Sequence, residues 1–191
     1  MLKIKGKIIL ASASPRRAKL LKELGLKFII YPVKIKEERQ IKQGCAKLVK
    51  RNALRKAREV AKRFKRGIVI GADTVVLVKK RLIGKPRNYR EAKKFLRLFS
   101  QYPHWVYTGL AIIDIERKKC YTAYDKTKII FHKLSDEEID KYLSRNLSLD
   151  RAGGIDIEGE AKKLVKEIRG DFYNVVGLPI DRFKELWSKL V

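Results

Sequence analysis

Residues that build metal centres and disulfide frameworks are scarce in this chain. Its 191 residues include two cysteines, two histidines and one methionine. Cys45 and Cys120 form no C-x-x-C pair, and neither His104 nor His132 adjoins a cysteine. A structural zinc site needs several such ligands at short, regular spacing. The sequence therefore argues against a zinc site.

Long apolar runs are also absent. No run approaches the roughly 20 residues that a helix needs to cross a bilayer. The first residues lead into a strand-like run without a signal-peptide cleavage site. Hydrophobic residues make up 45% of the chain, which is ordinary for a globular protein. We therefore expect a cytoplasmic protein with a single domain over residues 1–191.

Acidic residues are few for the number of basic ones. The chain has 47 Lys and Arg against 21 Asp and Glu, a formal net charge of +26. Such a field attracts polyanions, either nucleic acid or a nucleoside triphosphate. Thermal adaptation is a third interpretation, because Lys, Arg and Ile are abundant whereas Gln, Asn and Met are scarce. No nucleic-acid-binding motif is present, so a basic binding protein is the alternative rather than the main hypothesis.

Strand-like and helix-like segments alternate along the chain. The strands are expected at residues 7–11, 28–31, 68–78, 106–115, 121–131 and 164–168. The helices are expected at residues 16–24, 45–64, 89–100 and 135–143, and from residue 179 onward. This alternation predicts an α/β fold, a three-layer sandwich around a mixed sheet with some antiparallel pairing.

The first candidate for chemistry lies between a strand and a helix. Ser12-Ala13-Ser14-Pro15-Arg16-Arg17 contains a good N-cap, Ser14, followed by proline at the first helical position. Free backbone N–H groups and the helix dipole bind phosphate at such a terminus, and arginine adds bidentate donors. The segment predicts a phosphate cradle, or alternatively a capped helix with two solvent-facing arginines.

The second candidate is a carboxylate within the most apolar strand. Asp73 interrupts the run from Ile68 to Val78, where a carboxylate must be paired, hydrogen-bonded or bound to metal. Alternatively, the strand reaches the surface there. Glu37 and Glu38 lie in a basic loop, and Lys85 follows a short strand. Taken alone, these three are weak candidates for a cation ligand and a phosphate-neutralising group.

Glycine is concentrated in a third candidate segment. Residues 151–159 contain three glycines, which permit close approach of a ligand to the backbone. Within this segment, Asp156 and Glu158 can accept hydrogen bonds from a base edge. The sequence Asn174 to Pro179 predicts a tight turn before the last helix.

Together these segments resemble the Maf family of nucleoside triphosphate pyrophosphatases. The matching segments are Leu10–Arg17, Gly71–Thr74, Gly84–Pro86, Asp150–Gly153 and Val176–Pro179. They occur in the family's order and together extend over nearly the whole chain. The resemblance implies a fold like that of inosine triphosphatases, with two lobes around a cleft, often as a homodimer. It also implies hydrolysis of nucleotides to the monophosphate and pyrophosphate with Mg²⁺ or Mn²⁺.

The resemblance assigns roles to particular residues. Ser12, Ser14, Arg16 and Arg17 match the phosphate-binding motif, and Lys85 matches a phosphate lysine. The two serines and two arginines, with Thr74 and Glu158, are therefore expected to bind the substrate, and Lys85 is expected to act on the phosphates as a catalytic residue.

A second group matches the catalytic part of the family pattern. Asp73 corresponds to the catalytic acid and Thr74 lies in the same motif, while Lys56 corresponds to a helix lysine. Glu37 corresponds to the loop glutamate, although the adjacent Glu38 leaves the register open. Asp73 and Glu37 are the expected metal ligands.

The base preference depends on Glu158. The branch that takes dTTP and UTP is expected to carry glutamine there, whereas the branch that acts on 7-methyl-GTP carries glutamate. The segments at Gly153-Gly154 and 171–177 resemble the dTTP/UTP branch more closely. We therefore expect dTTP, UTP or modified pyrimidine nucleotides as substrates, with 7-methyl-GTP as the alternative.

Overall fold

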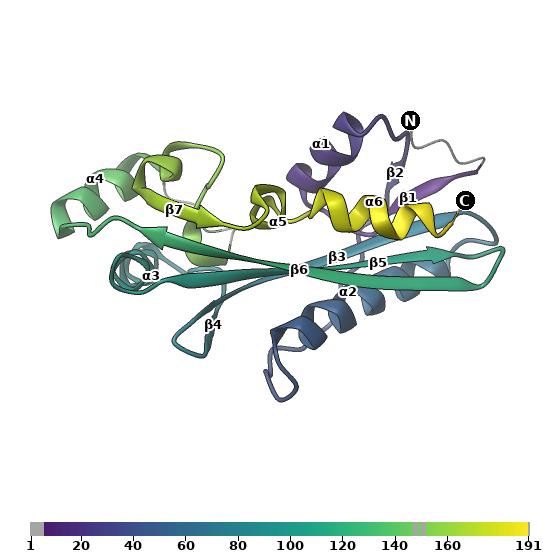
Figure 1. Cartoon of the computed structure of the whole chain (residues 1–191), viewed down its shortest axis with the longest axis horizontal. Helices are drawn as coiled ribbons and strands as arrows, with labels where there is room; N and C mark the ends of the chain where they lie inside the picture. Colours follow the sequence, from purple (N-terminus) through teal and green to yellow (C-terminus); the bar gives the residue numbers. More distant parts are fainter. Residues whose placement is uncertain (1–5, 147–148, 150–151, 191) are drawn as a thin grey trace. The chain divides into compact units, whose positions relative to one another are not determined.

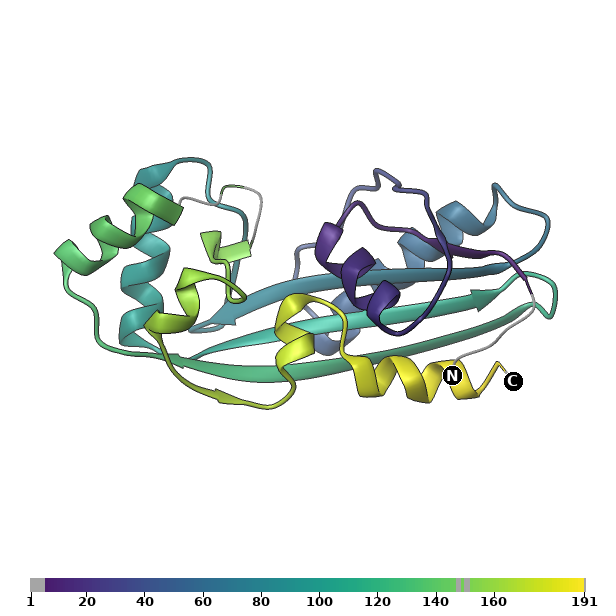
Figure 2. The same cartoon turned by 90° about the horizontal axis from the view of Figure 1, so that it is seen from above.

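The structure, a computed structural model, describes residues 6–146, 149 and 152–190 (Figures 1 and 2). Asp150 and Arg151 of the glycine-rich motif lie outside these residues. The chain divides into two compact units. Unit 1 comprises Met1–Thr74, Thr108–Asp125 and Val176–Val191, and unit 2 comprises Val75–Tyr107 and Lys126–Val175. Within the described residues, no helix is both long enough and apolar enough to cross a membrane.

The described strands form one mixed sheet in the order β2-β1-β3-β5-β6-β7, with β4 paired to β3. Its strands are β1 (Ile8–Leu10), β2 (Ile29–Ile30), β3 (Ile68–Val78), β4 (Arg81–Ile83), β5 (His104–Asp114), β6 (Lys119–Phe131) and β7 (Val165–Arg169). β1 pairs in parallel with β2 and β3, while β4 and β7 are antiparallel to their neighbours. The predicted α/β class with a mixed sheet is confirmed.

Helices cover both faces of the strands in unit 1. They are α1 (Pro15–Glu23), α2 (Cys45–Ala61) and α6 (Ile180–Ser188). Figure 1 shows α2 below the strands and α1 above them, so this unit has three layers. The predicted start of α1 is confirmed, because Ser14 is the N-cap and accepts a hydrogen bond from the backbone N–H of Arg17 at 3.5 Å.

Two glycines let α2 lie directly on the backbone of the sheet. A Cβ atom at Gly71 of β3 would lie 2.3 Å from the carbonyl oxygen of Ala53. At Gly109 of β5 it would lie 2.3 Å from the carbonyl carbon of Val49. No side chain fits in either position without displacing the helix. The polar residues on this face of α2 are thereby brought close to β3.

Unit 2 contains the segments Val75–Tyr107 and Lys126–Val175. Its helices are α3 (Tyr89–Gln101), α4 (Asp136–Asn146) and α5 (Phe172–Val176), with 3₁₀ turns at η1 (Ala152–Gly154) and η2 (Glu160–Leu164). The predicted capping box of α4 is confirmed. The Ser135 N–H donates to Oε2 of Glu138 at 2.7 Å, and the Glu138 N–H donates to Oγ of Ser135 at 3.2 Å.

One local prediction is wrong. Residues from Asn174 onward were expected to form only a tight turn, but Phe172–Val176 is a short helix. Asn174 is fully buried and donates hydrogen bonds to the Val106 carbonyl at 3.0 Å and to Oγ1 of Thr127 at 2.9 Å. These contacts with distant strands stabilise a conformation that the local sequence does not indicate.

A buried histidine lies in the core of unit 2. His104 is 1% exposed and packs between the rings of Phe99 and Phe131, with centroids 4.2 and 5.3 Å away. Within the described part of the chain, its Nδ1 has no hydrogen-bond partner. Burial lowers the pKa of His104 to about 4, although a hydrogen bond with the Tyr102 backbone opposes the shift.

This histidine predicts acid-sensitive stability. Between pH 6.5 and 4 the unfolded chain binds a proton that the folded chain excludes, so acid lowers the free energy of unfolding. The loss attributable to His104 is about 3 kcal/mol over this window. Denaturant unfolding as a function of pH should therefore give a shallower slope for His104→Leu than for wild type. The exposed His132→Gln variant is the control, and equal slopes for all three proteins would contradict the prediction.

Candidate active site

The segment after β1 presents hydroxyls and backbone N–H groups at the start of α1. Oγ of Ser12 accepts hydrogen bonds from the Ser14 N–H at 3.2 Å and from Nη1 of Arg17 at 3.0 Å. Arg16 lies in the first turn and is half-buried. A helix N-terminus with an adjacent guanidinium favours an anion such as phosphate. The phosphate roles of these residues stay predictions.

Arg17 connects three of the segments that carry the family resemblance. Its Nε donates to the carbonyl of Gly177 at 2.9 Å, and its Nη2 donates to Oγ1 of Thr74 at 2.9 Å. Its Nη1 donates to the Ala72 carbonyl at 3.2 Å as well as to Ser12. Burial lowers the pKa of Arg17. The guanidinium therefore organises the site through at least four bonds to the protein itself.

The planar fork of Arg17 predicts a measurable stability effect. A lysine has one nitrogen and cannot reach acceptors in four directions. Each buried acceptor left unpaired destabilises the folded state by about 1–3 kcal/mol. We expect Arg17→Lys to lower the free energy of unfolding in urea by about 2 kcal/mol or more. Arg16→Lys is the neighbouring control, and an unchanged midpoint for Arg17→Lys would show that the four bonds contribute little.

Asp73 lies on the face of β3 that meets α2. It is 4% exposed, and its Oδ1 lies 2.6 Å from Nζ of Lys56. The same ammonium lies 2.6 Å from Oε1 of Glu37. Lys56 thus bridges the two carboxylates, and the three residues form a compact charged cluster in unit 1. Thr74 points to the opposite face, where its Oγ1 is 2.9 Å from Oγ1 of Thr108.

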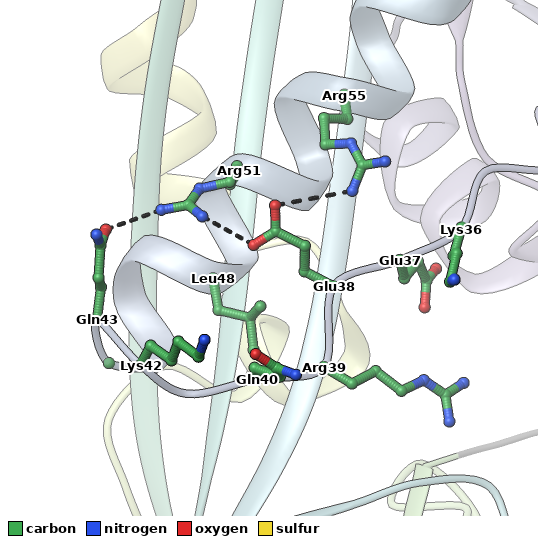
Figure 3. Close-up of a pocket in the computed structure, with 11 residues that line it drawn as sticks. Lys36, Glu37, Glu38, Arg39, Gln40, Lys42, Gln43, Leu48, Arg51 and Arg55 are labelled. Atoms are coloured by element: carbon green, nitrogen blue, oxygen red, sulfur yellow. Dashed lines mark hydrogen bonds and ion pairs between the residues drawn. The ribbon is translucent and has the colours of Figure 1, made fainter.

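The structure separates the two neighbouring glutamates. Figure 3 shows Glu38 reaching toward Arg51 and Arg55, while Glu37 points away from both. Glu38 lies 2.9 Å from Nη1 of Arg51 and 3.8 Å from Nη1 of Arg55. Burial by itself would raise the pKa of Glu37, but the hydrogen bond and charge of Lys56 outweigh it and lower that pKa. Of the two side chains, it is that of Glu37 that contacts Lys56 in the cluster around Asp73.

Sequence reasoning missed one member of this cluster. Asn52 of α2 is 1% exposed, and its Nδ2 donates to Oδ2 of Asp73 at 3.0 Å. The sequence feature that could have identified Asn52 is its amide among the apolar residues of one face of the helix. The apolar residues of that face are Leu48, Val49, Ala53, Ala57 and Val60.

Two predicted residues belong to unit 2. Lys85 follows β4 and is exposed, and Glu158 is exposed in the turn after η1. The backbone N–H of Gly153 donates to the carbonyl of Gly84 at 2.9 Å. The glycine-rich segment and the segment that carries Lys85 therefore meet within this unit.

The carboxylates of Asp73 and Glu37 are suited to a hard divalent cation. Mg²⁺ binds through one or two carboxylates and takes its other ligands from phosphates and water. Within the described residues, no group of three or more His, Cys, Asp or Glu is placed to hold a metal. Together with oxygens from substrate phosphates and water, the two carboxylates that contact Lys56 are the residues that could hold such a cation.

Known proteins match this chain over nearly its full length. The sequence profile described as Maf-like protein matches residues 7–190. A dTTP/UTP pyrophosphatase from Dictyoglomus thermophilum is 38% identical, over 98% of this chain and 97% of its own. Another from Bacillus cereus is 44% identical, over 92% of this chain and 91% of its own.

The fold has a counterpart among solved structures. The Ham1 protein of Staphylococcus aureus superposes with a TM-score of 0.56 at 11% identity, covering 97% of this chain and all of that one. This likeness confirms the α/β fold implied by the resemblance. With the profile match over nearly the full length, the comparisons establish that the chain belongs to the Maf-like protein family.

Proposed function

We propose that this chain hydrolyses nucleoside triphosphates to the monophosphate and pyrophosphate, with dTTP and UTP as preferred substrates. The relatives at 38% and 44% identity are named dTTP/UTP pyrophosphatases. The observation that carries the proposal is the cluster in which Lys56 contacts both Asp73 and Glu37. Carboxylates beside a cationic side chain can bind a divalent metal and orient a water molecule, as the hydrolysis of a phosphoanhydride requires.

In this proposal the start of α1 binds phosphate oxygens. Its N-terminal N–H groups, with Ser14 and Arg16, supply donors and positive charge. A bound Mg²⁺ or Mn²⁺, held by Asp73 and Glu37, would neutralise charge on the phosphates. Arg17 joins this segment to the rest of the unit through its bonds to Ser12, Ala72 and Gly177.

Asp73 is proposed to orient or deprotonate the attacking water. Its carboxylate is held from two sides, by Lys56 on Oδ1 and by Asn52 on Oδ2, so its position is fixed before substrate arrives. Fixed groups need little reorganisation during the reaction, and positioning with electrostatics then supplies most of the acceleration. The net positive charge of the chain, +26, favours capture of the anionic substrate.

Base selection is assigned to Glu158 by resemblance alone. A carboxylate accepts hydrogen bonds but donates none, which would suit a base that presents donors. Substrate preference therefore tests this role, and 7-methyl-GTP is the competing substrate. The phosphate contact of Lys85, the homodimer and the cytoplasmic location also stay predictions.

The test is pyrophosphate release from a panel of nucleotides with Mg²⁺ or Mn²⁺. The panel contains dTTP, UTP, CTP, GTP, 7-methyl-GTP, ITP and modified pyrimidine nucleotides, and a chelator serves as the metal-free control. Fastest release from dTTP and UTP supports the proposal. Preference for 7-methyl-GTP would support the proposed hydrolysis but contradict dTTP and UTP as the preferred substrates. No release, together with salt-dependent binding to random oligonucleotides, would favour a basic binding protein.

A further inference from the structure

One buried amide joins the loop that carries Glu37 to the strand that carries Asp73. The Nδ2 of Asn52 donates to Oδ2 of Asp73 and to the backbone carbonyl of Glu38, each at 3.0 Å. Its Oδ1 accepts from the backbone N–H of Glu38, also at 3.0 Å. One side chain of α2 therefore holds both a strand carboxylate and a loop backbone.

The chemistry of these partners admits only an amide at this position. A carboxylate requires a donor, the Glu38 N–H requires an acceptor, and the Glu38 carbonyl requires a second donor. Asparagine supplies two N–H donors and an oxygen acceptor from one short side chain. Leucine of similar size supplies neither, and aspartate supplies only acceptors. Glutamine has the right groups on a longer stem, which does not fit a site that is 1% exposed.

We propose that Asn52 is a positioning residue for the hydrolysis, an inference that rests on the function proposed above. On one side it holds Oδ2 of Asp73, so that Oδ1 of the same carboxylate faces Lys56 at 2.6 Å.

On the other side Asn52 anchors the backbone of Glu38, the residue next to Glu37. That anchor places the Glu37 carboxylate 2.6 Å from the same Nζ of Lys56. The amide of Asn52 thus sets the distance between the carboxylates of Asp73 and Glu37.

The side chain of Glu38 provides a second, external attachment for the loop. It pairs with Arg51, whose side chain is 45% exposed. Exposed ion pairs contribute little to stability, whereas buried groups left unpaired are costly. We therefore expect the buried bonds of Asn52 to fix the position of the loop more strongly than the ion pair of Glu38. Arg51, the residue before Asn52 in α2, provides the control.

The experiment compares Asn52→Leu, Asn52→Asp and the control Arg51→Met with the wild-type full chain. Pyrophosphate release from dTTP with Mg²⁺ gives kcat and KM, and thermal unfolding confirms that each variant is folded. Hydrogen–deuterium exchange without nucleotide or metal reports the protection of residues 36–44.

In Asn52→Leu we expect kcat to fall about 10- to 100-fold with little change in KM, as for other residues that orient catalytic ligands. The segment 36–44 should also lose exchange protection, because the Glu38 N–H loses its acceptor. In Asn52→Asp the acceptor remains and the segment stays protected, but kcat falls at least as far because a second carboxylate faces Asp73. Arg51→Met should resemble wild type in all three measurements.

The inference is overturned if both Asn52 variants retain a kcat within the range of Arg51→Met, or if they raise KM while kcat is unchanged. Failure of the proposed function would look different, because the wild-type chain itself would then release no pyrophosphate. In that case, the exchange protection of residues 36–44 still reports whether Asn52 anchors the loop. Equal protection of residues 36–44 in Asn52→Leu and wild type would overturn the anchoring without any appeal to activity.

Discussion

Replacing Asp73 by asparagine should lower pyrophosphate release by about 10²–10⁴-fold, the contribution typical of a general base. The variant keeps the size of the side chain but loses its negative charge. It also places an NH₂ group against either Lys56 or Asn52, both of which are donors to Asp73 in the wild type. Glu37 still pairs with the ammonium of Lys56, so the cluster keeps one anion and the fold should survive.

A matched control for this variant lies on a neighbouring strand of the same unit. Asp114 is also buried, at 6% exposure, and its Oδ1 accepts from the Arg117 N–H at 3.0 Å. Asp114→Asn keeps that acceptor and should release pyrophosphate at close to the wild-type rate. Both variants should show cooperative thermal unfolding. Near-normal kcat in folded Asp73→Asn would remove Asp73 from the mechanism.

Much of the fold could be predicted because its local signals agree with each other. The apolar run at 68–78 gives β3 with the expected bounds, and the Ser-Pro pair gives the start of α1. The capping box at Ser135 gives the start of α4. Such signals act within a few residues. The short helix α5 escaped prediction because its buried Asn174 bonds to residues 47 and 68 positions away.

The candidate site was less accessible to sequence reasoning, since its contacts join distant segments. Asp73 could be singled out because a carboxylate in an apolar strand is conspicuous. Lys56 could not, because the chain has many lysines and only the resemblance pointed to it. The choice between Glu37 and Glu38 depended on a loop without periodicity. In the structure, the side chain of Asn52 bonds to the backbone of Glu38, and it is the Glu37 carboxylate that reaches Lys56.

Arg17 was singled out for a phosphate contact, but its partners in the structure are groups of the protein itself. Its position after Ser14 and Pro15 suggested a phosphate contact, since two adjacent arginines at a helix start resemble an anion site. In the structure its guanidinium bonds to the carbonyls of Ala72 and Gly177, 55 and 160 residues away. No local pattern encodes those partners. The arginine therefore links strand and C-terminal segments that spacing alone could not bring together.

The second large effect is expected at Gly71, where α2 rests on the sheet. Gly71→Ala would place Cβ 2.3 Å from the carbonyl oxygen of Ala53, a backbone atom that cannot rotate away. Overpacking costs about 1–3 kcal/mol where side chains can adjust, and we expect at least about 3 kcal/mol here because the whole helix must shift. The shift would also move Lys56 and Asn52 away from Asp73, so activity should fall together with the melting temperature.

Gly44→Ala is the control at the start of the same helix. A Cβ atom there meets nothing within 4 Å, and only the strain of a φ of +84° is added. If Gly71→Ala unfolds at the temperature of Gly44→Ala and retains pyrophosphatase activity, close packing of α2 on β3 does not position the site.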